Sequence, residues 1–225
     1  GKVGTYAVRD TTTTLGAAAL MMTELIAKDL TAYAGVYFWF RSSLTTAAGD
    51  MALLLDDTAL CATPIEILSL PALTAATWKQ CFVRLATPAS DGSLISVGLR
   101  QVTDLADGTF DIDDVEALAE LDGMKAWAID STTSVIDTTD FADAGVRSVL
   151  PSVSQWSGSF EGLKDGVPLS IGSEVYLVLG ESGTASQNWI GKVIITGATP
   201  SVAFDGVVTY AYTFEGTGAL EIPGA

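Results

Sequence analysis

The chain has 225 residues, of which 48% are hydrophobic, so it is long enough to bury the cores of one large or two small domains. It carries 27 acidic and 11 basic residues, a net charge of -16, and no histidine. A surface of this sign repels a phosphate backbone, which argues against a protein that grips nucleic acid. Cys61 and Cys81 predict two buried thiols rather than a disulfide. No apolar run approaches the roughly 18 residues of a membrane span, so no membrane partner is expected.

Residues 1–122 are predicted to form the first domain. Short apolar segments of strand length, bounded by Thr, Gly, Pro and Asp, recur through it at residues 36–40, 51–55, 82–85, 94–99 and 110–118. Residues 17–28 have helical spacing and good helix formers, but they also fit a pair of strands, and both interpretations stay open. Strands at this spacing predict an antiparallel β-sandwich or jelly roll.

The segment LTAYAGVYFWFRSS concentrates aromatic side chains in the first domain. Tyr33, Tyr37, Trp39 and Phe40 could form a platform on which sugar rings stack. Alternatively, Tyr37 and Trp39 fill one face of a strand while Phe38 and Phe40 fill the other. We favour the second interpretation, because a strand with large apolar residues on both faces is normally buried on both.

The same segment and the run FDIDDVEAL at residues 110–118 resemble the jelly-roll modules related to carbohydrate-binding domains. The last strand of that family often reads as an aromatic, a hydrophobic residue and then Asp-Asp-Val. The resemblance implies a structural calcium held from an opening strand. No such strand precedes Gly4, which suggests that the sequence begins inside the domain and leaves the calcium open. For Asp113 and Asp114 we favour a pair at an edge or beside a loop over metal ligands.

Residues 123–225 are predicted to form a second β domain with one short helix. Thr138, Thr139 and Asp140, followed by Asp143 and Gly145, have the composition of a capped helical turn. Residues 155–162 alternate as in a half-buried strand, and further strands are predicted at residues 174–179, 189–196 and 207–214. The predicted core residues are Trp156, Phe160, Trp189 and Tyr212.

The order of these pieces, an acidic and Thr-rich turn followed by RSVLPSVSQWSGSFEG, resembles the major tail tube proteins of long-tailed bacteriophages. The resemblance covers residues 124–225 and includes TFEGTGAL at residues 213–220, which is similar to the last strand of that family. It implies a tail-tube-like β-barrel or sandwich whose copies close into rings around a channel. It also implies that a long loop and the chain ends reach neighbouring subunits, here residues 180–188 and 217–225.

Catalytic machinery is hard to assemble from this composition. Without histidine the usual general base is missing, and the glycine-rich segments lack the lysine and the strand–loop–helix setting of a phosphate loop. A glycosidase pair could draw on Asp56, Asp57, Asp113 or Asp114, but acidic pairs are expected by chance among 27 carboxylates. We therefore predict that the protein is not an enzyme and that it has no catalytic, cofactor-binding or metal-binding residues.

The sequence thus favours a virion structural protein, a tail tube subunit that binds copies of itself and other virion proteins while DNA passes without specific binding. The jelly roll would face outward, where host glycans are possible partners. One alternative is a capsid decoration protein with the same fold, and another is a secreted glycan-binding module.

Overall fold

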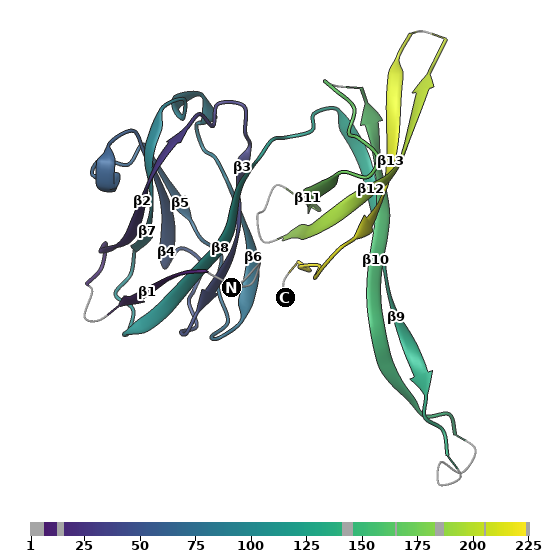
Figure 1. Cartoon of the computed structure of the whole chain (residues 1–225), viewed down its shortest axis with the longest axis horizontal. Coiled ribbons are helices and arrows are strands. Elements are labelled where there is room, and N and C mark those ends of the chain that lie inside the picture. The colour runs from purple at the N-terminus through teal and green to yellow at the C-terminus, as the bar shows by residue number, and fades with distance from the viewer. Residues whose placement is uncertain are drawn as a thin grey trace. The chain divides into compact units, whose positions relative to one another are not determined.

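The computed structural model of the chain describes residues 7–12, 16–140, 146–164, 166–182, 187–204 and 206–223. Its strands are β1 (Val8–Thr12), β2 (Leu20–Lys28), β3 (Gly35–Ser42), β4 (Met51–Asp56), β5 (Glu66–Ser69), β6 (Trp78–Arg84), β7 (Leu94–Gln101), β8 (Gly108–Leu118), β9 (Met124–Asp137), β10 (Val149–Leu163), β11 (Glu174–Gly180), β12 (Asn188–Val202) and β13 (Val208–Gly216). The 3-10 helices η1 (Ala59–Cys61) and η2 (Pro88–Ser90) complete the regular structure. The prediction of an all-β protein is confirmed (Figure 1). Among the described residues, no helix is both long and apolar enough to cross a membrane.

The chain divides into two compact units. The first comprises residues 1–120, 180–190 and 221–225, and the second comprises residues 121–179 and 191–220. The division after Glu120 falls close to the position where the sequence predicts a domain boundary, but the first unit also takes two short segments from the C-terminal half.

The first unit is a sandwich of two antiparallel sheets, with strand orders β1-β8-β3-β6 and β2-β7-β4-β5. Side chains from both sheets meet in one core, with Phe38 and Phe40 of β3 packed in the same cluster as Leu53 of β4 and Phe110 of β8. Phe40 stacks on Phe110 with the ring centroids 6.3 Å apart. The apolar segments predicted as strands therefore belong to the two sheets of the sandwich, and their buried side chains form the core between these sheets.

Residues 17–28 form neither a helix nor a pair of strands. From Leu20 to Lys28 they make the single strand β2, which pairs with β7 at one edge of its sheet. Met21, Met22 and Ile26 pack against the core of the first unit. Pairing with β7 therefore overrides the local helical propensity of this segment.

The second unit contains one antiparallel sheet in the order β11-β12-β13-β10-β9. Its core, on one face of the sheet, consists of Trp156, Phe160, Val193, Ile195, Tyr212 and Phe214. Phe160 stacks on Tyr212 at 5.0 Å between the ring centroids. The strict alternation predicted for residues 155–162 accounts for this face, although β10 begins six residues earlier, at Val149.

Trp156 is fixed in this core by close approach to glycine backbone. A Cβ atom on Gly216 would lie 2.1 Å from the Trp156 ring, and one on Gly191 would lie 2.5 Å from it. The indole Nε1 donates a hydrogen bond to the carbonyl oxygen of Gly218 at 2.8 Å. Gly191 and Gly216 thus leave space for a large aromatic ring.

Two predictions in this half need qualification. The prediction of Trp189 as a core residue is wrong, because it is half-buried and lies outside the core cluster of the second unit. Its Nε1 donates to Glu181 Oε1 at 2.6 Å. The capped helical turn falls largely on residues 141–145, so Asp143 and Gly145 lie outside the described part of the chain.

Candidate assembly surface

The sheet of the second unit ends in two edge strands, β9 and β11. Among the described residues, β9 pairs only with β10. An edge strand presents a row of backbone N–H and C=O groups that can accept another strand. The second unit therefore offers one pairing surface at each side of its sheet.

A two-stranded arm extends from this sheet. Strand β13 pairs with β10 only from Ser157 to Leu163, whereas β9 pairs with β10 from Gly162 back to Val149. Residues 131–137 and 149–155, here called the arm, therefore continue beyond the neighbouring strand (Figure 1). A two-stranded ribbon is marginally stable in water by itself. An arm of this length is therefore expected to pack against another protein surface.

The arm exposes apolar side chains on both of its faces. Val135 pairs with Pro151 on the face that continues the core side of the sheet, and Ile136 pairs with Leu150 on the opposite face. Ile136 is 56% exposed and Leu150 is 58% exposed. A bulge near Val153, itself 68% exposed, shifts the register between these pairs and the sheet. Exposed apolar side chains on both faces make the arm a candidate interaction surface.

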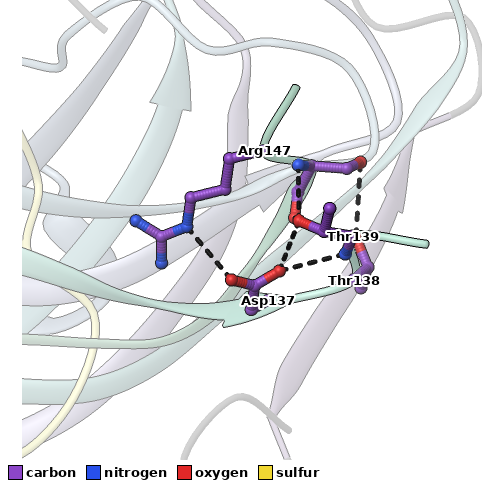
Figure 2. A network of polar contacts seen from close by, with 5 residues as sticks. Asp137, Thr138, Thr139 and Arg147 are labelled. Atoms are coloured by element: carbon purple, nitrogen blue, oxygen red, sulfur yellow. Dashed lines mark hydrogen bonds and ion pairs between the residues drawn. The ribbon is translucent and has the colours of Figure 1, made fainter. Parts of the chain in front are cut away.

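A polar network holds the distal end of the arm together (Figure 2). Asp137 accepts hydrogen bonds from the amide and the hydroxyl of Thr139 at 3.0 and 2.6 Å, and Arg147 Nε lies 3.2 Å from its other carboxylate oxygen. Ser148 N donates to Thr139 Oγ1, and Thr138 N donates to the Ser148 carbonyl oxygen. Hydrogen bonds from Thr139, and less strongly from Arg147, hold the pKa of Asp137 below its usual value. Sequence reasoning singled out Thr138 and Thr139 but missed Asp137 and Arg147.

The face of the sheet opposite the core carries small and acidic side chains on β9, β10 and β13. We call this surface the open face: Ala126, Ala128, Asp130, Ser157, Ser159, Glu161, Thr209, Ala211, Thr213 and Glu215. Its residues form rows across the strands, with Asp130, Ser157 and Glu215 in one row and Ala126, Glu161 and Ala211 in another. These described positions include three carboxylates and no basic or aromatic side chain. The open face on β9, β10 and β13 is therefore acidic, which repels phosphate. On β11 and β12 the same side of the sheet carries Tyr176 and Lys192, whose Nζ lies 5.1 Å from the Tyr176 ring centroid.

The proposed sugar platform is not assembled in the first unit. Tyr37 and Phe40 are fully buried, Trp39 is 8% exposed, and only Tyr33 of the four reaches the surface substantially. The Tyr37 hydroxyl donates to Gln80 Oε1 at 3.0 Å. The interpretation of β3 as a strand buried on both faces is confirmed.

The acidic pairs singled out in the sequence have local structural roles. Asp56 accepts hydrogen bonds from the amide and hydroxyl of Thr58 and from the amide of Thr63, which fixes the turn after β4. Asp113 and Asp114 lie at a bulge in β8, where Asp114 adopts a φ of 54° and its amide donates to Asp113 Oδ1. Within the described residues, no three His, Cys, Asp or Glu side chains gather closely enough to hold a metal ion.

Both cysteines are buried and free. Burial raises the pKa of the Cys81 thiol to about 12, so it stays protonated and unreactive at neutral pH. The prediction of two buried thiols is confirmed.

Comparison with known proteins gives little to set beside this geometry. No protein-family model matches the chain, and no curated protein matches it. A solved structure described as "Tail of empty GTA particle computed with helical refinement, C6 symmetry" contains a similar chain with 18% sequence identity and a TM-score of 0.37. The similarity covers 44% of this chain and 81% of that chain. Similarity at this level does not establish a shared function.

Proposed function

We propose that the protein is a virion structural protein, a subunit of a bacteriophage tail tube. The observation that carries this proposal is the single sheet of the second unit, which has an edge strand on each side. The resemblance of residues 124–225 to tail tube proteins supports it independently, because it rests on sequence.

The proposed ring forms when β9 of one copy pairs with β11 of the next. Such a contact joins two different surfaces, so it is heterologous, and it generates a ring if the rotation closes. Closure removes both free edges of the second unit's sheet, which is how barrels avoid uncontrolled strand pairing. Each subunit would then be incomplete without its neighbours.

The open face is the surface that suits the lumen of such a ring. Its carboxylates Asp130, Glu161 and Glu215 would repel the phosphate backbone, and its Ala, Ser and Thr side chains leave no anchor for a base. Because salt screens charges beyond about 8 Å at physiological ionic strength, the repulsion acts only if these residues line the passage. DNA would pass without specific binding.

The arm would provide the contacts between stacked rings. Burying Ile136 and Leu150 against a neighbouring subunit removes apolar area that a lone copy leaves in water. The segment at residues 180–188 and the chain end at residues 217–225 are further candidates for contacts between copies. The first unit would decorate the outside of the tube.

Electron microscopy of the purified protein tests the assembly directly. We expect rings or tubes at high protein concentration. A monodisperse monomer at every concentration would contradict self-assembly, and binding to empty capsids without self-assembly would instead favour a decoration protein.

Cysteine cross-linking tests which edges meet. Val178 on β11 lies opposite the core-facing Leu177 and Leu179, on the same side of the sheet as the open face. Strand direction alternates across the five-stranded sheet, so β9 and β11 run the same way and would pair in parallel between copies. Neighbouring strands lie about 4.8 Å apart, which brings facing Cβ atoms within reach of a disulfide. Val178→Cys is therefore combined in turn with Ala126→Cys, Ala128→Cys and Asp130→Cys. At least one combination should give a ladder of covalent oligomers under oxidising conditions.

The single-cysteine variants are the matched controls, because the native thiols are buried and free. They should yield no species beyond a dimer. If rings are seen by microscopy and no double variant forms a ladder, the pairing of β9 with β11 is wrong even though the protein assembles.

A further inference from the structure

Asp91 is the most unusual carboxylate of the first unit. It follows η2, its side chain is completely buried, and neither of its carboxylate oxygens has a hydrogen-bond partner. Its backbone is fixed on both sides, because its amide donates to the Pro88 carbonyl and its carbonyl accepts from the Leu30 amide. An ionised carboxylate held in this way would lack both water and a donor.

Glu66, the first residue of β5, has the opposite environment. It is only 3% exposed, but its Oε1 accepts from the amide and the hydroxyl of Thr87, and its Oε2 accepts from the Ala86 amide at 3.1 Å. Three donors favour the ionised form of a carboxyl group. Glu66 therefore has three hydrogen-bond donors, whereas the Asp91 carboxylate has none.

The charged groups around Asp91 provide no neutralising cation. Glu66 is the charged group that acts on it, while Asp29 in the adjoining segment is exposed and hydrogen-bonded to Thr31. Lys28 is exposed at the end of β2, and Arg84 at the end of β6 pairs with Glu120. The ion pairs found among the described residues include neither Glu66 nor Asp91. Burial, and then the neighbouring Glu66, raises the pKa of Asp91 to about 6.

We propose that Asp91 carries a proton, which it donates to the Glu66 carboxylate, and that this pair is a pH-sensitive connection between β5 and the segment joining β6 to β7. Below the transition one proton lies between the two groups and satisfies the oxygen that donates it. Above the transition the proton passes to solvent and leaves two adjacent buried anions. The first unit should then loosen around Leu30, Ala86 and Thr87, whose amides donate to Asp91 and Glu66.

The direction of the pH effect follows from the raised pKa. A group that binds its proton more tightly in the folded state stabilises that state at low pH and loses the contribution as pH rises through its folded pKa. Between about pH 5 and about pH 7.5, protection of the Ala86 and Thr87 amides against hydrogen exchange should fall by about tenfold, after correction for the intrinsic rate. Amides of β3 and β4 should keep their protection.

Carbon-13 NMR of the wild-type side chains is the decisive measurement. The Asp91 carboxyl carbon should titrate with a midpoint near pH 6. A midpoint near the ordinary aspartate value of about 4 would overturn the proposal.

Asp91→Asn tests the consequence, because an amide can donate to Glu66 at every pH. It should abolish the change in protection, and the matched variant Asp29→Asn on the adjoining exposed segment should preserve it. If Asp91→Asn lowered the protection of the Ala86 and Thr87 amides equally at both pH values, the proposal that Asp91 is protonated would be wrong. If millimolar calcium at neutral pH stabilises the wild type and not Asp91→Asn, the pair holds a cation and the proposal is wrong.

Discussion

The two units solve the same problem, an abundance of short apolar strands, in different ways. In the first unit two sheets cover each other, so that every described residue of β4 is buried and β3 is buried on both faces. In the second unit a single sheet buries one face of its central strands, while the distal half of β9 is exposed at every position. Both units have edge strands. They differ in that the first unit covers one sheet with the other, whereas the second leaves one face of its sheet and both faces of the arm exposed.

This difference bears on which unit is suited to remain exposed to solvent in an isolated subunit. Unpaired edges and an apolar two-stranded arm are liabilities for a monomer, and proteins either blunt such features or pair them with copies of themselves. The described part of β9 carries neither proline nor a dense row of charges. Under the proposed function, the first unit decorates the tube and the second assembles it, and the following experiments test this contrast.

The largest effect should come from removing an aromatic ring from the core of the second unit. Phe160 is 4% exposed and lies between Tyr212 and Phe214. Phe160→Ala should destabilise this unit by about 3–5 kcal/mol, because it leaves a cavity in a small core. Chemical denaturation followed by the near-ultraviolet signal of the tryptophans would measure the loss.

Phe204→Ala is the matched control, because Phe204 is fully exposed in the same unit. It should change stability by less than about 0.5 kcal/mol. Equal effects of the two substitutions would mean that the second unit lacks an independent core, which would remove one side of the comparison.

The arm comes next. Ile136→Asp combined with Leu150→Asp places charges on one exposed face, so the isolated subunit should keep its circular dichroism spectrum and its melting temperature. Each residue should contribute about 1.5 kcal/mol when buried in a contact, so the concentration needed for assembly should rise by about a hundredfold. Sedimentation velocity over a concentration series measures this change.

Val167→Asp is the corresponding control, because Val167 is 87% exposed in the same unit but lies outside the arm. Assembly of this variant should match the wild type. Unchanged assembly of the double variant would show that the arm has no role in contacts between copies.

Local sequence patterns predicted the strands whose side chains are strongly apolar or alternate between buried and exposed positions. Apolar runs such as residues 51–55 and the alternation of Trp156, Gly158 and Phe160 identify strands without knowledge of their partners. Strand β9 was missed because its distal half is mostly Ser and Thr and shows no alternation of buried apolar residues; its pairing with β10 keeps it extended. The sequence did not indicate the Glu66–Asp91 pair either, since the two residues are distant in sequence and neither belongs to a recognisable motif. Partners that are distant in sequence cannot be inferred from local patterns.

A smaller effect should come from the glycine that admits Trp156. Gly216→Ala would place a Cβ atom 2.1 Å from the indole, so the ring or the strand must move. We expect a loss of about 1–3 kcal/mol in the second unit, as in other overpacked cores. Gly218→Ala is the control, because nothing lies within 4 Å of its added Cβ. Both substitutions should leave the stability of the first unit unchanged. Hydrogen exchange can measure the protection of both units in a single sample.

The smallest effect concerns the network that closes the arm. The pKa of Asp137 is lowered chiefly by the Thr139 hydroxyl and amide, so the ionised carboxylate stabilises the folded arm above the unfolded pKa. That contribution is lost as pH falls through the folded pKa, the opposite direction from Asp91. Thr139→Val removes the hydroxyl donor, and the midpoint of the Asp137 carboxyl carbon in an NMR titration should move up towards the ordinary aspartate value. Thr133→Val deletes a hydroxyl that contacts Ser154 elsewhere on the arm, and it should leave that midpoint unchanged. Equal midpoints in the wild type and Thr139→Val would mean that the arm ends without this network, and the apolar side chains near its end would then have to be held by the neighbouring subunit alone.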